Sequence, residues 1–135
     1  MTTIKTFILF AFFAILLINT ANGQDNTIAE GLLKTAEDFR NKSNPDSAIE
    51  YYEKSAIEFN KNGNIEKTIN SYNQIGIILT RQDKYEKAKT YLDKALSMGL
   101  SSLDANNLVI ATTYISLGVV SAAENQFEQS LIYHN

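Results

Sequence analysis

The residues that could carry acid–base, nucleophilic or metal chemistry are sparse in this 135-residue chain. It has one histidine, His134, no cysteine and 15 acidic residues. The acidic residues fall at helix-surface spacings, as Glu50 does four residues before Lys54, and do not form pairs typical of a catalytic cleft. The glycine-containing stretch Asn62–Asn64 indicates a turn and not a phosphate-binding loop. We therefore expect no enzyme activity, no metal and no cofactor from these residues.

The charge balance bears on the class of partner. The chain carries 12 basic and 15 acidic residues, and Lys5 belongs to the distinct N-terminal segment, so the remainder has a formal charge of −4. Surfaces that bind nucleic acid are instead strongly basic. The composition therefore argues against a nucleic-acid partner.

The N-terminal segment has the three-part layout of a secretory signal peptide. Lys5 supplies a positive charge, Phe7–Ile18 is an unbroken apolar run, and Ala21 and Gly23 are small residues spaced as at a cleavage site. The run is short for a membrane anchor, since a helix needs about 20 apolar residues to cross the hydrocarbon core. We predict that residues 1–23 are a cleaved signal peptide, with an uncleaved anchor or a buried helix as the alternatives. The protein is then expected to be periplasmic, extracytoplasmic or secreted.

The elements that position the other side chains form a repeat. Three stretches align without gaps, at residues 32–55, 72–95 and 114–135. A small residue recurs at intervals of 40 and 42 residues, at Ala36, Gly76 and Gly118. Another small residue follows each of these after twelve positions, and a large one after sixteen: Ala48 and Tyr52, Ala88 and Leu92, Ser130 and His134.

This spacing predicts helical hairpins in an all-α protein. Within each stretch the small and large residues share one helix face, and small residues facing one another let two helices approach closely. The second helix of each hairpin is predicted to begin at an N-cap residue that is followed three positions later by an acidic residue. These pairs are Ser43 with Asp46, Asp83 with Glu86, and Asn125 with Glu128. Pro45 suits a first helical turn, and Gly63 and Gly99 are expected to end the second helix of their hairpins.

These residues resemble the tetratricopeptide repeat. Its small–large–small signature is carried by the packing positions Ala36, Phe39, Ala48, Tyr52, Gly76, Leu79, Ala88, Leu92, Ala95 and Gly118. The third stretch departs from the signature at Ser121 and Ser130, and an unrelated helical bundle is the alternative. The resemblance implies a right-handed α-solenoid over residues 24–135, with about two and a half repeats near 29–68, 69–110 and 111–135.

The resemblance also implies a concave groove lined by the first helix of each repeat, which would bind a protein or peptide. Its groove positions fall near Glu30, Leu33, Glu37, Arg40, Asn70, Asn73, Ile77, Thr80, Thr112, Ile115 and Val119. Asn70 and Asn73 could hold a peptide backbone through their amides, and Ile77, Ile115 and Val119 could receive an apolar side chain. A variety of the family grips a C-terminal carboxylate with converging Lys, Arg and Asn. Only Arg40 and Asn73 match it, which disfavours that ligand.

Three functions remain compatible with the sequence. Such long repeats look like those of the N-terminal extracytoplasmic sensor region of bacterial signalling proteins, so a sensory or scaffold part of a longer signalling protein is the first. A free periplasmic or secreted scaffold is the second, and the non-catalytic part of an exported enzyme, such as a membrane histidine kinase, is the third. The repeat register would place the next small residue beyond Asn135, so the chain is expected to be a leading fragment whose last helix self-associates.

Overall fold

The computed structural model describes the backbone of residues 27–134 and the side chains of residues 27–126. The signal peptide predicted at residues 1–23 lies outside the described residues. The described part contains five helices and no strand. They are residues 27–41, α2 (Pro45–Lys61), α3 (Ile65–Arg81), α4 (Tyr85–Ser102) and α5 (Leu108–His134).

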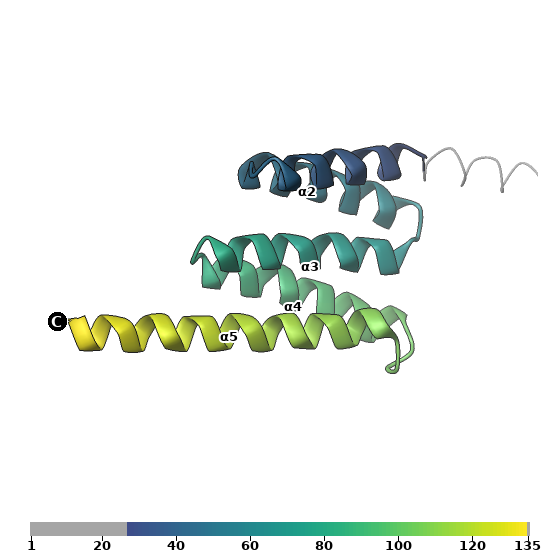
Figure 1. Ribbon diagram of the computed structural model, residues 1–135. Coiled ribbons are helices and arrows are strands. Elements are labelled where there is room, and N and C mark those ends of the chain that lie inside the picture. The colour runs from purple at the N-terminus through teal and green to yellow at the C-terminus, as the bar shows by residue number, and fades with distance from the viewer. Residues whose placement is uncertain (1–26, 135) are drawn as a thin grey trace, which may run out of the picture.

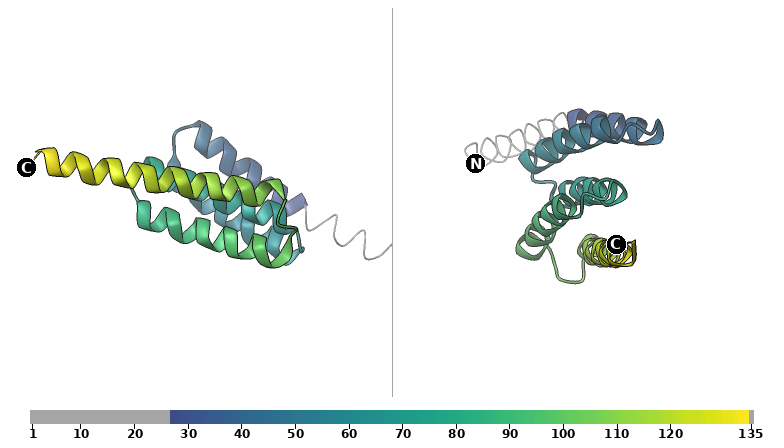
Figure 2. Two further views of the ribbon diagram at one scale, coloured as in Figure 1. Left: turned by 90° about the horizontal axis from the view of Figure 1, so that it is seen from below. Right: turned by 90° about the vertical axis from the view of Figure 1, so that its left-hand side faces the viewer.

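Consecutive helices run antiparallel and stack in one direction, as Figure 1 shows. The 27–41 helix pairs with α2, α3 pairs with α4, and α5 lies against both α3 and α4 (Figure 2). Helix α3 also packs on α2, so it is enclosed by neighbours in both directions of the stack. The prediction of an all-α fold built from helical hairpins is confirmed.

Three turns of the same geometry join the first four helices. The second residue after each helix has a positive φ, at Ser43 (56°), Gly63 (72°) and Asp83 (60°). The amide of the next residue then donates to the carbonyl five positions back, as Asn44 N–H does to Phe39 O at 3.0 Å. This is the Schellman arrangement, which satisfies the last carbonyls of a helix. The turns recur every 20 residues, so each hairpin accounts for one 40-residue repeat.

The predicted N-caps at Ser43 and Asp83 are wrong by one residue. Both residues hold the left-handed position of the turn, and the caps are Asn44 and Lys84. The Asn44 side chain accepts from Ser47 N–H at 3.3 Å, whereas Lys84 forms no side-chain cap. The reason is that the left-handed position does not require glycine, since aspartate and related small polar residues tolerate it. Pro45 occupies the first turn of α2, as predicted.

Of the two glycines expected to end a helix, only Gly63 does so. It follows the C-cap residue Asn62 of α2 and has a φ of 72°. Gly99 is instead buried inside α4, which continues to Ser102. A Cβ at Gly99 would lie 2.8 Å from Ile110 Cγ1, so the missing side chain lets α5 approach α4 closely. This glycine serves packing and not chain reversal.

The turn predicted at Asn125 is also wrong, because α5 runs through it without interruption. The residues from Ala122 to Gln126 include two alanines, a glutamate and a glutamine, which favour helix. The third stretch also carries serine at 121 and 130, where the second repeat has the buried Leu79 and Ala88. The apolar contacts that would hold a returning helix are therefore weaker here.

The core lies between the two layers of helices. The small and large repeat residues Ala36, Ala48, Tyr52, Leu79, Ala88, Leu92 and Ala95 are at most 4% exposed. Phe39 is partly buried and stacks on Tyr51, with ring centroids 5.3 Å apart. Gly118, expected at a helix contact, has no atom within 4 Å of a Cβ placed there, because none of the described helices returns along that side of α5. Within the described residues, one segment, Leu108–Gln126 of α5, is long and apolar enough to cross a membrane. A single helix of this kind is weak evidence for a membrane-spanning segment, because core helices of soluble proteins can have the same length and composition.

Candidate functional site

Two clefts lie between the first helices of successive repeats. The first, here called the apolar cleft, lies between α3 and α5 and has a volume of 370 Å³. It is lined by Ile77, Thr80, Arg81, Thr112, Ile115, Ser116 and Val119. Ile115 and Val119 are 69% and 56% exposed, although they are large apolar side chains on a regular helix. The cleft therefore presents uncovered apolar surface that solvent reaches.

The hydroxyl groups of the apolar cleft are already engaged by the backbone. Thr80 Oγ1 donates to Gly76 O at 2.7 Å, Thr112 Oγ1 to Leu108 O at 3.0 Å, and Ser116 Oγ to Thr112 O at 3.0 Å. Their protons are not available to a ligand, so the cleft offers few free donors apart from Arg81. This chemistry suits an aliphatic or aromatic side chain.

The second, here called the polar cleft, lies on the opposite flank of α3 and has a volume of 250 Å³. It is lined by Leu33, Glu37, Arg40, Tyr52, Lys67, Asn70, Ser71 and Gln74. Arg40 Nη1 donates to Gln74 Oε1 at 2.8 Å across the two helices. Lys67 forms an ion pair with Glu30, and Ser71 Oγ contacts Ser55 Oγ at 3.0 Å. The cleft is thus rich in donors carried by two different hairpins.

The floor of the polar cleft contains a buried phenol. Tyr52 is 0% exposed, and its hydroxyl has no hydrogen-bond partner among the described residues. Burial raises the pKa of this hydroxyl above its ordinary value, while the charge of Arg40 lowers it and that of Glu37 raises it. The group is therefore a neutral donor at physiological pH, close to one cation and one anion that line the same cleft.

The structure divides the groove residues predicted from the sequence between the two clefts. Leu33, Glu37, Arg40 and Asn70 line the polar cleft, and Ile77, Thr80, Thr112, Ile115 and Val119 line the apolar cleft. Asn73 lines neither cleft: it is 1% exposed, and neither polar atom of its side chain has a hydrogen-bond partner among the described residues. It shares a helix face with Glu66 and Ile77, the face that α5 and its preceding loop cover.

Sequence reasoning missed six of the lining residues: Tyr52 as a polar group, Lys67, Ser71, Gln74, Arg81 and Ser116. Three of them could have been found, because Lys67, Gln74 and Arg81 follow helical spacing with the predicted Asn70 along one stripe of α3. Tyr52 could not, since its position in the repeat indicates packing and says nothing of its hydroxyl.

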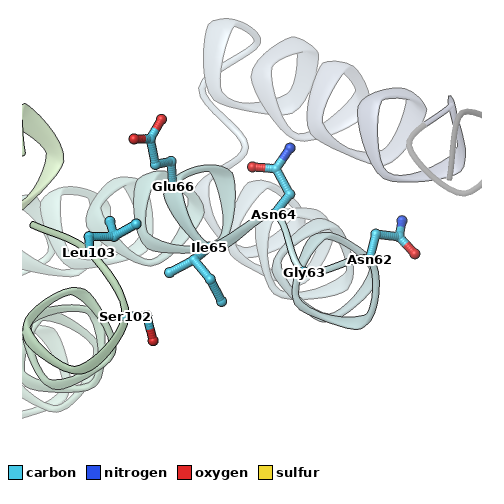
Figure 3. Close-up of a pocket in the computed structure, with 7 residues that line it drawn as sticks. All are labelled: Asn62, Gly63, Asn64, Ile65, Glu66, Ser102 and Leu103. Carbon is cyan, nitrogen blue, oxygen red and sulfur yellow. The ribbon is translucent and has the colours of Figure 1, made fainter. Parts of the chain in front are cut away.

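A third hollow, of 460 Å³, lies beside the turn between α2 and α3 (Figure 3). Its labelled side chains point in different directions and do not converge on one point. Asn64 Oδ1 accepts from Lys67 N–H, and Glu66 accepts from Asn107 Nδ2 at 2.6 Å. These polar groups therefore stabilise the turns of the scaffold, and the hollow is not a candidate site.

Comparison with protein families decides the classification. A family model described as tetratricopeptide repeat matches residues 27–99 and 67–135, which together span the whole described region. The chain belongs to the tetratricopeptide repeat family. No curated protein and no solved structure gives a match. Tetratricopeptide repeats typically mediate protein–protein interaction and are typically non-catalytic, and no catalytic domain is found in the chain.

Proposed function

We propose that this tetratricopeptide repeat domain binds an extended peptide segment of a partner protein along the face that contains the two clefts. The apolar cleft supports this most directly, because it joins exposed Ile115 and Val119 to hydroxyls that already donate to the backbone. A peptide residue such as leucine would cover this surface. Full burial of one such side chain contributes about 1.5–3 kcal/mol.

The test replaces one cleft residue and one matched residue elsewhere. Ile115→Asn places a polar group in the apolar cleft, and Ile57→Asn makes the same change at 58% exposure on α2, outside either cleft. Binding is measured by fluorescence anisotropy with a labelled random peptide library that has one fixed leucine. We expect Ile115→Asn to weaken binding at least tenfold and Ile57→Asn to leave it unchanged. Equal effects of the two substitutions would exclude the apolar cleft as the binding site.

We further propose that the protein is exported, and the support is the layout of residues 1–23. Residues 1–30 fused to alkaline phosphatase, an enzyme active only after export, should give activity, and deletion of Phe7–Ile18 should abolish it. A fusion without activity would refute export.

The more specific form of the proposal is that the chain is a sensory or scaffold part of a longer signalling protein. A second apolar segment of about 20 residues encoded after Asn135 would support it, whereas a stop codon there would favour a free scaffold.

A further inference from the structure

Two donors in the polar cleft have no anionic partner. The hydroxyl of Tyr52 has no acceptor at all among the described residues, although the side chain is 0% exposed. The guanidinium of Arg40 donates only to the neutral amide of Gln74 and forms no ion pair within the described part of the chain. A buried polar group without a partner costs free energy, so native proteins retain it mainly where a ligand supplies the partner or a function requires it.

A second tyrosine in the same structure shows the ordinary solution. Tyr91 of α4 donates its hydroxyl to the carboxylate of Glu53 on α2. Burial and this hydrogen bond raise the pKa of Tyr91 to about 12. The fold thus supplies a carboxylate to one tyrosine that lies between its hairpins. Tyr52 lines the cleft between the 27–41 helix and α3, but no carboxylate of the described residues accepts a hydrogen bond from its hydroxyl.

We propose that the polar cleft binds the side-chain carboxylate of an acidic residue in the partner peptide, with Tyr52 and Arg40 as its donors. This inference rests on the proposed function, because the acidic residue belongs to the peptide whose apolar residue fills the apolar cleft. One carboxylate would satisfy the phenol by a charge-assisted hydrogen bond and would also neutralise Arg40. A backbone carbonyl would satisfy only the hydroxyl.

The neighbouring charges favour a single negative charge. Lys67 is already paired with Glu30, and Glu37 adds a negative charge at the edge of the cleft. A doubly charged phosphate would meet more repulsion from Glu37 than a carboxylate does. Glu37 is exposed, so its side chain can turn to solvent when a carboxylate enters.

The positions of the two clefts predict the spacing of the peptide motif. Along α3 the residues of the polar cleft precede those of the apolar cleft by about nine positions, or roughly 13 Å of helix. The clefts flank α3 on opposite sides, which adds about 10 Å across the helix. The two displacements are perpendicular and combine to about 16 Å, and an extended chain rises about 3.3 Å per residue, so the acidic and apolar residues should be separated by about five positions.

The experiment uses the purified chain and two acetylated, amidated peptide libraries. Both have one fixed leucine, and at the positions five before and five after it one library has glutamate and the other glutamine. We expect the glutamate library to bind about tenfold more tightly, the scale of a hydrogen bond to a charged group. If both bind equally, the polar subsite is wrong while the proposed function stands. If neither binds, the proposed function itself fails.

Substitutions then locate the contact. Tyr52→Phe should reduce the preference for glutamate and raise the melting temperature of the free protein, because it removes an unpaired buried hydroxyl. Tyr51→Phe removes a hydroxyl from the same helix outside the cleft and should preserve the preference. Arg40→Gln should reduce the preference, whereas Lys42→Gln, the same loss of charge nearby, should not. A preference that Tyr52→Phe leaves unchanged would overturn the assignment.

Two further peptides distinguish other anions. A peptide with glutamine and a free C-terminus tests whether a chain-terminal carboxylate is the true ligand, and one with phosphoserine tests phosphate. Tighter binding of either than of the amidated glutamate peptide would overturn the proposal in favour of that group.

Discussion

Helices α3 and α5 carry the same repeat residues in two different surroundings. Tyr72 and Gly76 of α3 correspond to Tyr114 and Gly118 of α5, 42 residues later. Tyr72 is 6% exposed, and a Cβ on Gly76 would lie 2.6 Å from Leu92 Cγ. Tyr114 is 53% exposed, and a Cβ on Gly118 would meet nothing within 4 Å. The repeat pattern therefore marks the side of a helix that accepts a neighbour, but not whether the neighbour is present.

The difference extends to how firmly each helix is held. Helix α3 packs against α2, α4 and α5, whereas α5 packs mainly against α3 and α4 within the described part of the chain. Along α5 large apolar side chains remain open to solvent, among them Leu108 at 80% and Ile115 at 69% exposure. Local opening requires less free energy where few apolar contacts are lost, so backbone amides of α5 should exchange faster than those of α3.

The largest expected effect on stability comes from adding a side chain at Gly76, where α3 already contacts α4. Gly76→Leu places a branched side chain where Leu92, itself 0% exposed, already lies. Overpacking of this kind costs about 3 kcal/mol, a large part of the stability of a small domain. Urea unfolding followed by circular dichroism should show a lower midpoint and reduced helicity.

Gly118→Leu is the matched control for this substitution, because it adds the same side chain at the corresponding position of α5. It should leave the midpoint unchanged or raise it. Equal losses of stability in the two variants would show that the repeat register is wrong.

An intermediate effect on stability is expected from a substitution at Gly99, where α4 contacts α5. Gly99→Ala adds a Cβ 2.8 Å from Ile110 Cγ1 and 3.4 Å from Ile69 Cδ1, and so separates α4 from α5. The overpacking cost exceeds the gain in helix propensity of about 1 kcal/mol, and we expect a net loss of about 1 kcal/mol. Hydrogen exchange should show faster exchange in α5 than in the unmodified protein and little change in α2. Uniform acceleration through all helices would instead indicate that α5 unfolds together with the hairpins.

The first two helical hairpins are predictable from the sequence because their main signal is periodic. The spacing of Ala48 with Tyr52 and of Ala88 with Leu92 predicts the inward faces of their helices, and these residues are buried. Turn positions are less certain, since Ser43 and Asp83 adopt a backbone conformation that the sequence indicates clearly only at glycine. The repeat pattern also predicts a turn at Asn125, which the local preference of Ala122–Gln126 for helix overrides.

The candidate site is only partly predictable for a different reason. Groove positions follow from the helix face, and Ile77, Ile115 and Val119 lie together in the apolar cleft. The accessibility of Asn73 depends instead on how closely α5 approaches α3, which its own helix does not specify. The unpaired hydroxyl of Tyr52 is likewise a property of three helices together. Whether a buried polar group finds a hydrogen-bond partner depends on the packing of several helices, so the spacing of residues along one helix does not reveal it.

The smallest effect, and one of opposite sign, is expected from Gly118→Ala. Alanine in a helix interior is favoured over glycine by about 1 kcal/mol, and at Gly118 no neighbouring atom opposes the new methyl group. The unfolding midpoint at low micromolar concentration should therefore rise. If copies of the chain associate through this face of α5, the same methyl group would occupy their contact, and sedimentation should show weaker association at high concentration. A lowered midpoint in a chain that sediments as a monomer would contradict an open face, because only a packed neighbour could reverse the sign.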